Sequence, residues 1–66
     1  MTHATKHDRS TIRACAAWSA AGTYLDGPFL RRAARAVSRD GVNASDWLRR
    51  LAPRDRQRLA QMVVAL

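Results

Sequence analysis

The stretch DGPFLRRAARAVSRDG, residues 26–41, has the clearest amphipathic pattern of the chain. At about 100° per residue, its apolar side chains fall on one arc of a helix and four arginines fall on the opposite arc. Asp26 or Gly27 can cap this helix, Pro28 suits its first position, and Gly41 suits the residue after its end. The stretch therefore predicts a helix over residues 29–39 with an arginine face, which we define as Arg31, Arg32, Arg35 and Arg39.

Two further helices are predicted on the C-terminal side. Asn43 is a good N-cap, and Asp46, three residues later, can act as the reciprocal acid of a capping box. Pro53 disfavours helical geometry at the preceding residue, so this helix should end near Leu51 or kink, and Pro53 should begin the next helix. The last helix has apolar residues at the i, i+3, i+4, i+7 spacing of a buried stripe, namely Leu59, Met62, Val63 and Leu66.

The N-terminal part predicts a tail followed by one more helix. Residues 1–8 are polar and lack apolar periodicity, so we expect a flexible tail. Asp8, Ser10 or Thr11 can cap an alanine-rich helix that runs to about Ala21. Both faces of this helix are nearly uncharged, which is typical of a helix enclosed on several sides. With no strand-like alternation, residues 1–66 are expected to form a single all-α domain, a small bundle of three to four short helices.

The size of the chain favours self-association. Sixty-six residues are close to the limit for one hydrophobic core, and alanine supplies much of the 47% hydrophobic content. A single cysteine allows no internal disulfide, so a second copy is the remaining source of buried area. We expect a homodimer whose contact is the C-terminal stripe of Leu59, Met62, Val63 and Leu66.

The charge of the chain favours an anionic partner. The net charge is +7, eleven of the twelve basic residues are arginine, and none of the five acids is glutamate. Codon bias in a GC-rich genome can enrich arginine, so the arginine face can be ordinary solvated surface. However, like charges on one helix face repel, and no glutamate is interleaved to relieve them. We therefore expect nucleic acid or an acidic patch on a protein to dock there.

Two other arrangements could bring arginines to a partner. The predicted helix over residues 29–39, the turn at 40–42 and the next helix could form a helix-turn-helix, with Asn43, Arg49 and Arg50 reading DNA. Against this, the usual alanine-to-glycine spacing is off by one residue, and Asp46 would sit close to phosphate. A second basic concentration surrounds Pro53, and it would extend the arginine face if the two lie side by side. It consists of Arg49, Arg50, Arg54, Arg56 and Arg58.

The sequence offers little for catalysis or metal binding. His3 and His7 have helical metal-pair spacing but lie in the expected tail, and Cys15 is expected to be a buried thiol. Without a positioned acid, base or nucleophile, we expect no enzyme, no cofactor, no metal site and no small-molecule substrate. The aromatic residues fall among apolar neighbours and are expected in the core, namely Trp18, Tyr24, Phe29 and Trp47.

These patterns favour a small basic regulatory protein that binds without chemistry. Nucleic acid is the slightly favoured partner, as for a compact DNA-binding repressor or accessory factor. The alternative is a protein-binding inhibitor, of the stand-alone kind encoded by phages or other mobile elements, that blocks a host protein. No apolar run approaches the roughly eighteen residues of a membrane span, so we expect a cytoplasmic protein without membrane contact. No motif in the sequence indicates a known family.

Overall fold

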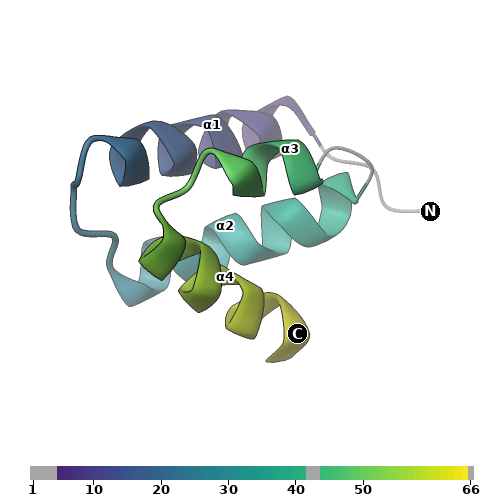
Figure 1. Ribbon diagram of the computed structural model, residues 1–66. Coiled ribbons are helices and arrows are strands. Elements are labelled where there is room, and N and C mark those ends of the chain that lie inside the picture. Colours follow the sequence, from purple (N-terminus) through teal and green to yellow (C-terminus); the bar gives the residue numbers. More distant parts are fainter. Residues whose placement is uncertain (1–4, 42–43, 66) are drawn as a thin grey trace.

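The computed structural model describes residues 5–41 and 44–65. This part of the chain folds into four helices and contains no strand, which confirms the predicted all-α bundle (Figure 1). The first two helices run side by side in opposite directions, the third contacts both of them, and the fourth packs against the second. The helices are α1 (Lys6–Ala20), α2 (Gly27–Asp40), α3 (Ala44–Arg49) and α4 (Pro53–Ala65).

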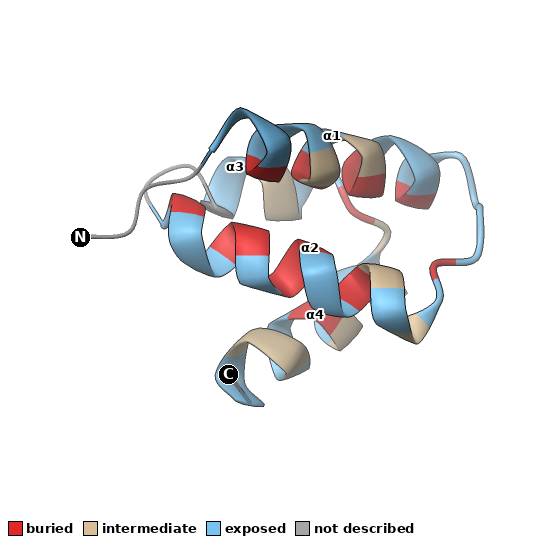
Figure 2. Cartoon of the chain, turned by 180° about the vertical axis from the view of Figure 1, so that it is seen from behind, coloured by how far each residue is buried: buried red, intermediate tan, exposed pale blue. Residues whose placement is uncertain are grey.

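The central helix of the bundle is α2. Its Leu30, Ala33 and Ala34 are 0% exposed, and it contacts each of the other three helices. By contrast, α1 buries only one side and exposes Ala17 and Ala20 (Figure 2). The first helix was expected to be enclosed on several sides, but within the chain the helix in that position is α2. The core contains Ile12, Cys15, Ala16, Leu25, Leu30, Ala33, Ala34, Ala36, Val37, Leu51 and Leu59.

The predicted caps of α2 are confirmed, and the helix extends beyond the predicted range of 29–39 at both ends. The carboxylate of Asp26 accepts a hydrogen bond of 2.8 Å from the backbone N–H of Phe29, which is the expected N-cap contact. Pro28 lies in the first turn, where its missing N–H leaves no hydrogen bond unmade. The helix ends at Asp40, and Gly41 follows with a positive φ of 21°.

The first helix begins earlier than expected, at Lys6. Thr5 is its N-cap, and the Thr5 hydroxyl accepts from the backbone N–H of Asp8 at 3.1 Å. In return, the carboxylate of Asp8 accepts from the backbone N–H of Thr5 at 3.0 Å. The capping box makes residues 5–8 part of the start of α1. The tail predicted over residues 1–8 was therefore too long.

The connection between α3 and α4 is held by side chains. As expected from Pro53, α3 stops at Arg49 and α4 begins at the proline. Arg56 donates from Nε to the carbonyl of Leu48 near the end of α3 at 3.1 Å, and from Nη2 to that of Leu51 in the connection at 3.2 Å. The predicted cap at Asn43 lies outside the described residues.

A buried hydroxyl joins this connection to α1. Ser19 is 2% exposed, and its Oγ donates to Oδ2 of Asp55 at 2.7 Å. The same Oγ accepts from the backbone N–H of Ala52 at 2.8 Å. One side chain of α1 therefore fixes both the residue before Pro53 and the first turn of α4.

Candidate functional site

The arginine face lies on the exposed side of α2, opposite its buried arc. Arg31, Arg32 and Arg35 are exposed, and none of them forms an ion pair with a residue that the structure describes. They point away from Leu30 and Ala33 because the two sets of residues occupy opposite arcs of one helix. Three guanidinium groups are therefore available to a partner along about one helical turn.

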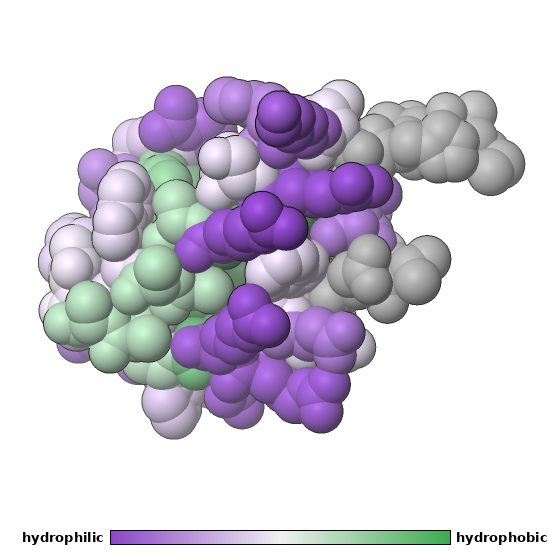
Figure 3. Space-filling view, turned by 90° about the horizontal axis from the view of Figure 1, so that it is seen from above, coloured by the Kyte–Doolittle hydropathy of each residue, from purple (hydrophilic) through white to green (hydrophobic). Residues whose placement is uncertain are grey.

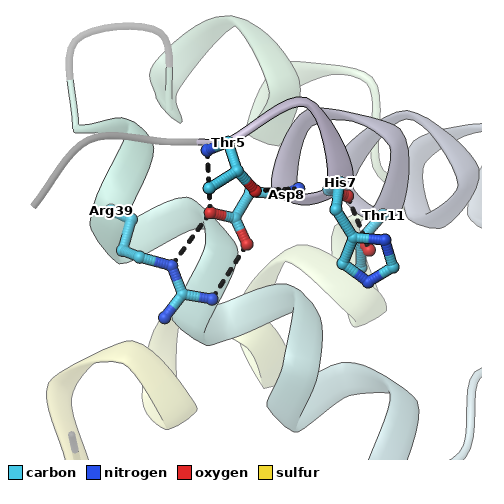
Figure 4. A network of polar contacts seen from close by, with 5 residues as sticks. All are labelled: Thr5, His7, Asp8, Thr11 and Arg39. Carbon is cyan, nitrogen blue, oxygen red and sulfur yellow. Dashed lines mark hydrogen bonds and ion pairs between the residues drawn. The ribbon is translucent and has the colours of Figure 1, made fainter.

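Arg39 is the exception on this face. It forms a two-pronged contact with Asp8 of α1, with Nε to Oδ2 and Nη2 to Oδ1 both at 2.9 Å (Figure 4). The hydrogen bonds from Arg39 are the main reason why the pKa of the Asp8 carboxyl lies well below its usual range, and the Thr5 N–H adds to the effect. Arg39 was expected to bind a partner, but its side chain is engaged in joining α1 to α2.

Beside this ion pair, α1 and α2 enclose a cleft of about 180 Å³. His7 and Thr11 line it from α1, and Arg32 and Arg35 line it from α2. In Figure 4, His7 and Thr11 lie next to each other on α1, and the Thr11 hydroxyl donates to the His7 carbonyl at 3.1 Å. The cleft therefore places cationic side chains of α2 next to polar side chains of α1.

An open hollow of about 360 Å³ lies at the α1–α2 loop. Trp18 and Tyr24, which were expected in the core, line this hollow and are 48% and 71% exposed. Trp18 contacts Phe29 with ring centroids 5.1 Å apart, and Arg32 lies 5.8 Å from the Phe29 centroid. The expectation for Trp18 and Tyr24 was wrong because Trp18 falls at the edge of the buried arc of α1 and Tyr24 lies in a loop.

Arg32 lines both the cleft and the hollow. Because they share this residue, we refer to the cleft and the hollow together as the α1/α2 groove. One end is aromatic and the other end carries arginines. Sequence analysis identified the arginines but not the aromatic end, because helical periodicity alone does not tell how far a tryptophan at the edge of an apolar arc is covered.

The second basic concentration is largely used within the chain. Arg49 forms an ion pair with Asp46, and both side chains are exposed. Arg58 donates to the carbonyl of Leu25 at 3.0 Å and pairs with Asp55 at 3.3 Å. Together with the contacts of Arg56 described above, these interactions are structural. Arg54 is exposed and makes no ion pair with the described residues.

Arg50 lies on the other side of α1 from the α1/α2 groove. Its guanidinium is 5.0 Å from the centroid of the half-buried Trp47 ring, and Arg13 approaches the same ring at 5.7 Å. Arg50 and Arg13 border a shallow alanine surface on α1 formed by Ala16, Ala17 and Ala20. Figure 3, which views the molecule from above, shows apolar surface bordered by hydrophilic side chains. The α1 helix separates Arg50 from Arg32, so these arginines do not form one patch.

The structure gives little support to the hypothesis of a helix-turn-helix that reads DNA. The helix that would read DNA, α3, has six residues, and its exposed Asp46 and Arg49 are paired with each other. The Trp47 indole N–H donates to Asp40 at 2.9 Å, which directs this side chain toward α2. Asn43 lies outside the described residues. The exposed cations of α2 are therefore better placed than those of α3 to contact phosphates.

The described residues of the C-terminal stripe differ in how far they are buried. Leu59 is 1% exposed and belongs to the core of its own chain, so it is not available as a dimer contact. Met62 and Val63 pack against this core and are half-buried, whereas Val64 is 87% exposed. Leu66 lies outside the described residues. The surface that remains for a partner is a hollow of about 450 Å³ that includes Val37, Leu48, Ala60, Val63 and Val64.

The thiol of the chain is buried. Cys15 is 2% exposed as expected, and burial together with the nearby charge of Asp55 raises the pKa of its thiol to about 11. The described residues hold no group of three or more His, Cys, Asp or Glu side chains suited to a metal ion. In the described part of the chain, each helix is too short or too polar to cross a membrane.

Comparison with known proteins finds no matching family model, no matching curated protein and no matching solved structure.

Proposed function

We propose that this protein is a small regulatory protein that binds nucleic acid through the arginine face of α2 and catalyses no reaction. The observation that carries the proposal is the exposure of Arg31, Arg32 and Arg35, which have no acidic partner among the described residues. Arginine keeps its charge at any working pH, and its planar fork matches the geometry of phosphate. Several phosphates along a strand would neutralise the three cations together.

The aspartates support this proposal because they are occupied elsewhere. Asp8 and Asp46 pair with Arg39 and Arg49, and Asp55 contacts Ser19 and Arg58. Asp26 caps α2, and Asp40 accepts from Trp47. Among the described residues, no carboxylate therefore pairs with Arg31, Arg32 or Arg35, and an external anion would relieve the repulsion between their like charges.

A second candidate is a protein-binding inhibitor that blocks an acidic host protein. The observation that favours it is the apolar hollow next to Val64, which also includes Ser38 of α2. Ser38 lies seven residues after Arg31 and so shares its side of the helix. An acidic protein with an apolar centre could contact both surfaces at once. The nucleic-acid proposal needs only the arginine face, and we place it first for that reason.

The buried state of Cys15 agrees with both candidates. A thiol with a pKa of about 11 stays protonated at neutral pH and is a poor nucleophile. One cysteine without a disulfide partner is also typical of a reducing compartment. We propose that the binding activity is cytoplasmic.

The test compares two double variants with the same net charge. Arg31→Gln with Arg35→Gln removes two cations from the arginine face. Arg9→Gln with Arg54→Gln removes two exposed arginines of α1 and α4 that form no ion pair with the described residues. Binding to labelled oligonucleotides is measured by fluorescence anisotropy, and folding is checked by circular dichroism.

The first double variant should bind at least about tenfold more weakly than the parent, since charge-assisted contacts contribute about 1.5–3 kcal/mol each. The control variant should lose much less. Equal losses in the two folded variants would show that only net charge matters and would remove the arginine face from the proposal. The absence of oligonucleotide binding by the parent would leave the acidic-protein candidate.

A further inference from the structure

Two large aromatic side chains stay exposed in a chain that has few of them. Trp18 is 48% exposed and Tyr24 is 71% exposed, although each could bury about 150–250 Å². Both line the hollow, and Arg32 lines both this hollow and the cleft that contains Arg35. A small domain with a limited core gives up stability by leaving these rings in solvent. Phe29 covers part of the Trp18 ring and Arg58 lies over the Tyr24 ring, and the exposed remainder of both rings offers a surface to a ligand.

Taking the proposed nucleic-acid function as its basis, we infer that the α1/α2 groove binds single-stranded nucleic acid, with a base stacked on Trp18 and the adjoining phosphates on Arg32 and Arg35. Aromatic stacking next to a basic track is how proteins hold single strands without reading their sequence. The contact between Trp18 and Phe29 keeps the indole in place while nearly half of it remains exposed.

The groove has room for a short strand. From His7 to Trp18, α1 advances by about 16 Å at 1.5 Å per residue. A stacked strand advances about 3.4 Å per nucleotide, so this length accommodates about five nucleotides. Arg32 and Arg35 lie in the middle of this path, between the aromatic end and the ion pair of Asp8 with Arg39.

The positions of the aspartates indicate which part of the groove takes the base and which takes the phosphates. Asp26 lines the aromatic hollow, where its Oδ1 accepts from the N–H of Phe29 at the start of α2. A carboxylate there disfavours a phosphate but not a neutral base. At the other end, Asp8 is already neutralised by Arg39. The base is therefore assigned to the aromatic end and the phosphates to the arginines in the middle of the groove.

A duplex fits this arrangement less well than a single strand does. Paired bases are stacked on their neighbours, so their faces are not free to contact Trp18. The usual duplex reader is a helix placed in the major groove. In that role, the short α3 would present Arg49 and Asp46, which pair with each other. The exposed indole thus favours the single strand over the duplex.

The experiment measures binding of one sequence of about twelve nucleotides as single-stranded DNA, single-stranded RNA and duplex DNA. The proteins are the parent, Trp18→Ala and Trp18→Phe, each checked by circular dichroism. Tryptophan fluorescence is recorded in the same titrations. In Trp18→Phe the only remaining tryptophan is Trp47, which lies on α3.

The parent should bind at least one type of single strand about tenfold or more tightly than the duplex, with quenching of its fluorescence. Trp18→Ala should weaken single-strand binding by about five- to 150-fold, the range for loss of one stacked base, and leave duplex binding unchanged. Trp18→Phe should retain most of the affinity because its ring can still stack. It should lose most of the quenching because the stacked indole is gone.

Equal binding of strand and duplex, with no effect of Trp18→Ala in the folded protein, would overturn the inference. The nucleic-acid proposal would then stand if the arginine variants still lose affinity. If the parent binds neither strand nor duplex, both proposals fail and the acidic-protein candidate remains.

Discussion

Asp8 and Arg39 lie 31 positions apart in the sequence and meet through two parallel hydrogen bonds of 2.9 Å each. The same carboxylate also accepts from the backbone N–H of Thr5. Asp8 therefore completes the capping box of α1 and fixes the start of α1 to the end of α2. This double role explains why one of the four arginines of the arginine face is not free for a partner.

The contribution of Asp8 to stability should depend on pH. Its pKa is lowered in the folded state, so its stabilising effect is fully present above the unfolded pKa of about 3.9. The effect is lost as the pH falls through the lower folded pKa. We expect the difference in free energy of unfolding between the parent and Asp8→Asn to be largest near neutral pH and to shrink steadily below about pH 4.

Urea denaturation at a series of pH values checks this prediction. Asp46→Asn is the matched control, because the Asp46 pair with Arg49 is exposed and such pairs contribute little. A difference between parent and Asp8→Asn that stays constant from neutral pH to pH 2 would show that the carboxylate of Asp8 does not carry the stabilisation.

Ser19→Ala should destabilise the fold by about 1–3 kcal/mol. The substitution removes a buried hydroxyl that donates to Asp55 and accepts from the N–H of Ala52, and it leaves both partners without this contact. Chemical denaturation gives the change in the free energy of unfolding. Ser38→Ala on the exposed side of α2 is the control and should change stability by a few tenths of a kcal/mol at most. Similar effects of the two substitutions would argue against the structural role of Ser19.

If two chains associate as the sequence predicts, the outer side of α4 should form the contact. Val64 is 87% exposed beside the apolar hollow that includes Val63, so a second copy could cover both. Val64→Asp should therefore shift the sedimentation coefficient from that of a dimer to that of a monomer, with unchanged helix content. A variant that remains dimeric would place the contact on another surface, and a parent that stays monomeric at millimolar concentration would refute the dimer.

Local signals made much of the fold predictable. Asp26, Pro28 and Gly41 act within one or two turns of α2, so the sequence alone indicates where this helix begins and ends. The same holds for Pro53 at the start of α4. The start of α1 was missed because residues 1–8 are polar and lack apolar periodicity, and because Asp8, Ser10 and Thr11 are themselves possible N-caps.

The parts that could not be predicted depend on contacts between distant residues. Helical periodicity placed Leu59 on an apolar stripe but did not tell whether that stripe faces the core of its own chain or a second copy. Likewise, the arginine count did not tell that Arg39 pairs with Asp8 or that Arg56 satisfies carbonyls of Leu48 and Leu51. Such assignments require the packing of four helices, which no local pattern contains.

The central claim is that the exposed arginines of α2 neutralise phosphates, and the salt dependence of binding tests it most directly. The logarithm of the association constant for a single-stranded oligonucleotide is measured against the logarithm of salt concentration. The affinity of the parent should fall steeply with salt, by about 0.7 log units per log unit of salt for each phosphate neutralised. In the Arg31→Gln, Arg35→Gln variant this slope should be shallower by about 1.4, because two phosphate contacts are lost. A parent slope near zero, or a slope that the double variant leaves unchanged, would contradict the account.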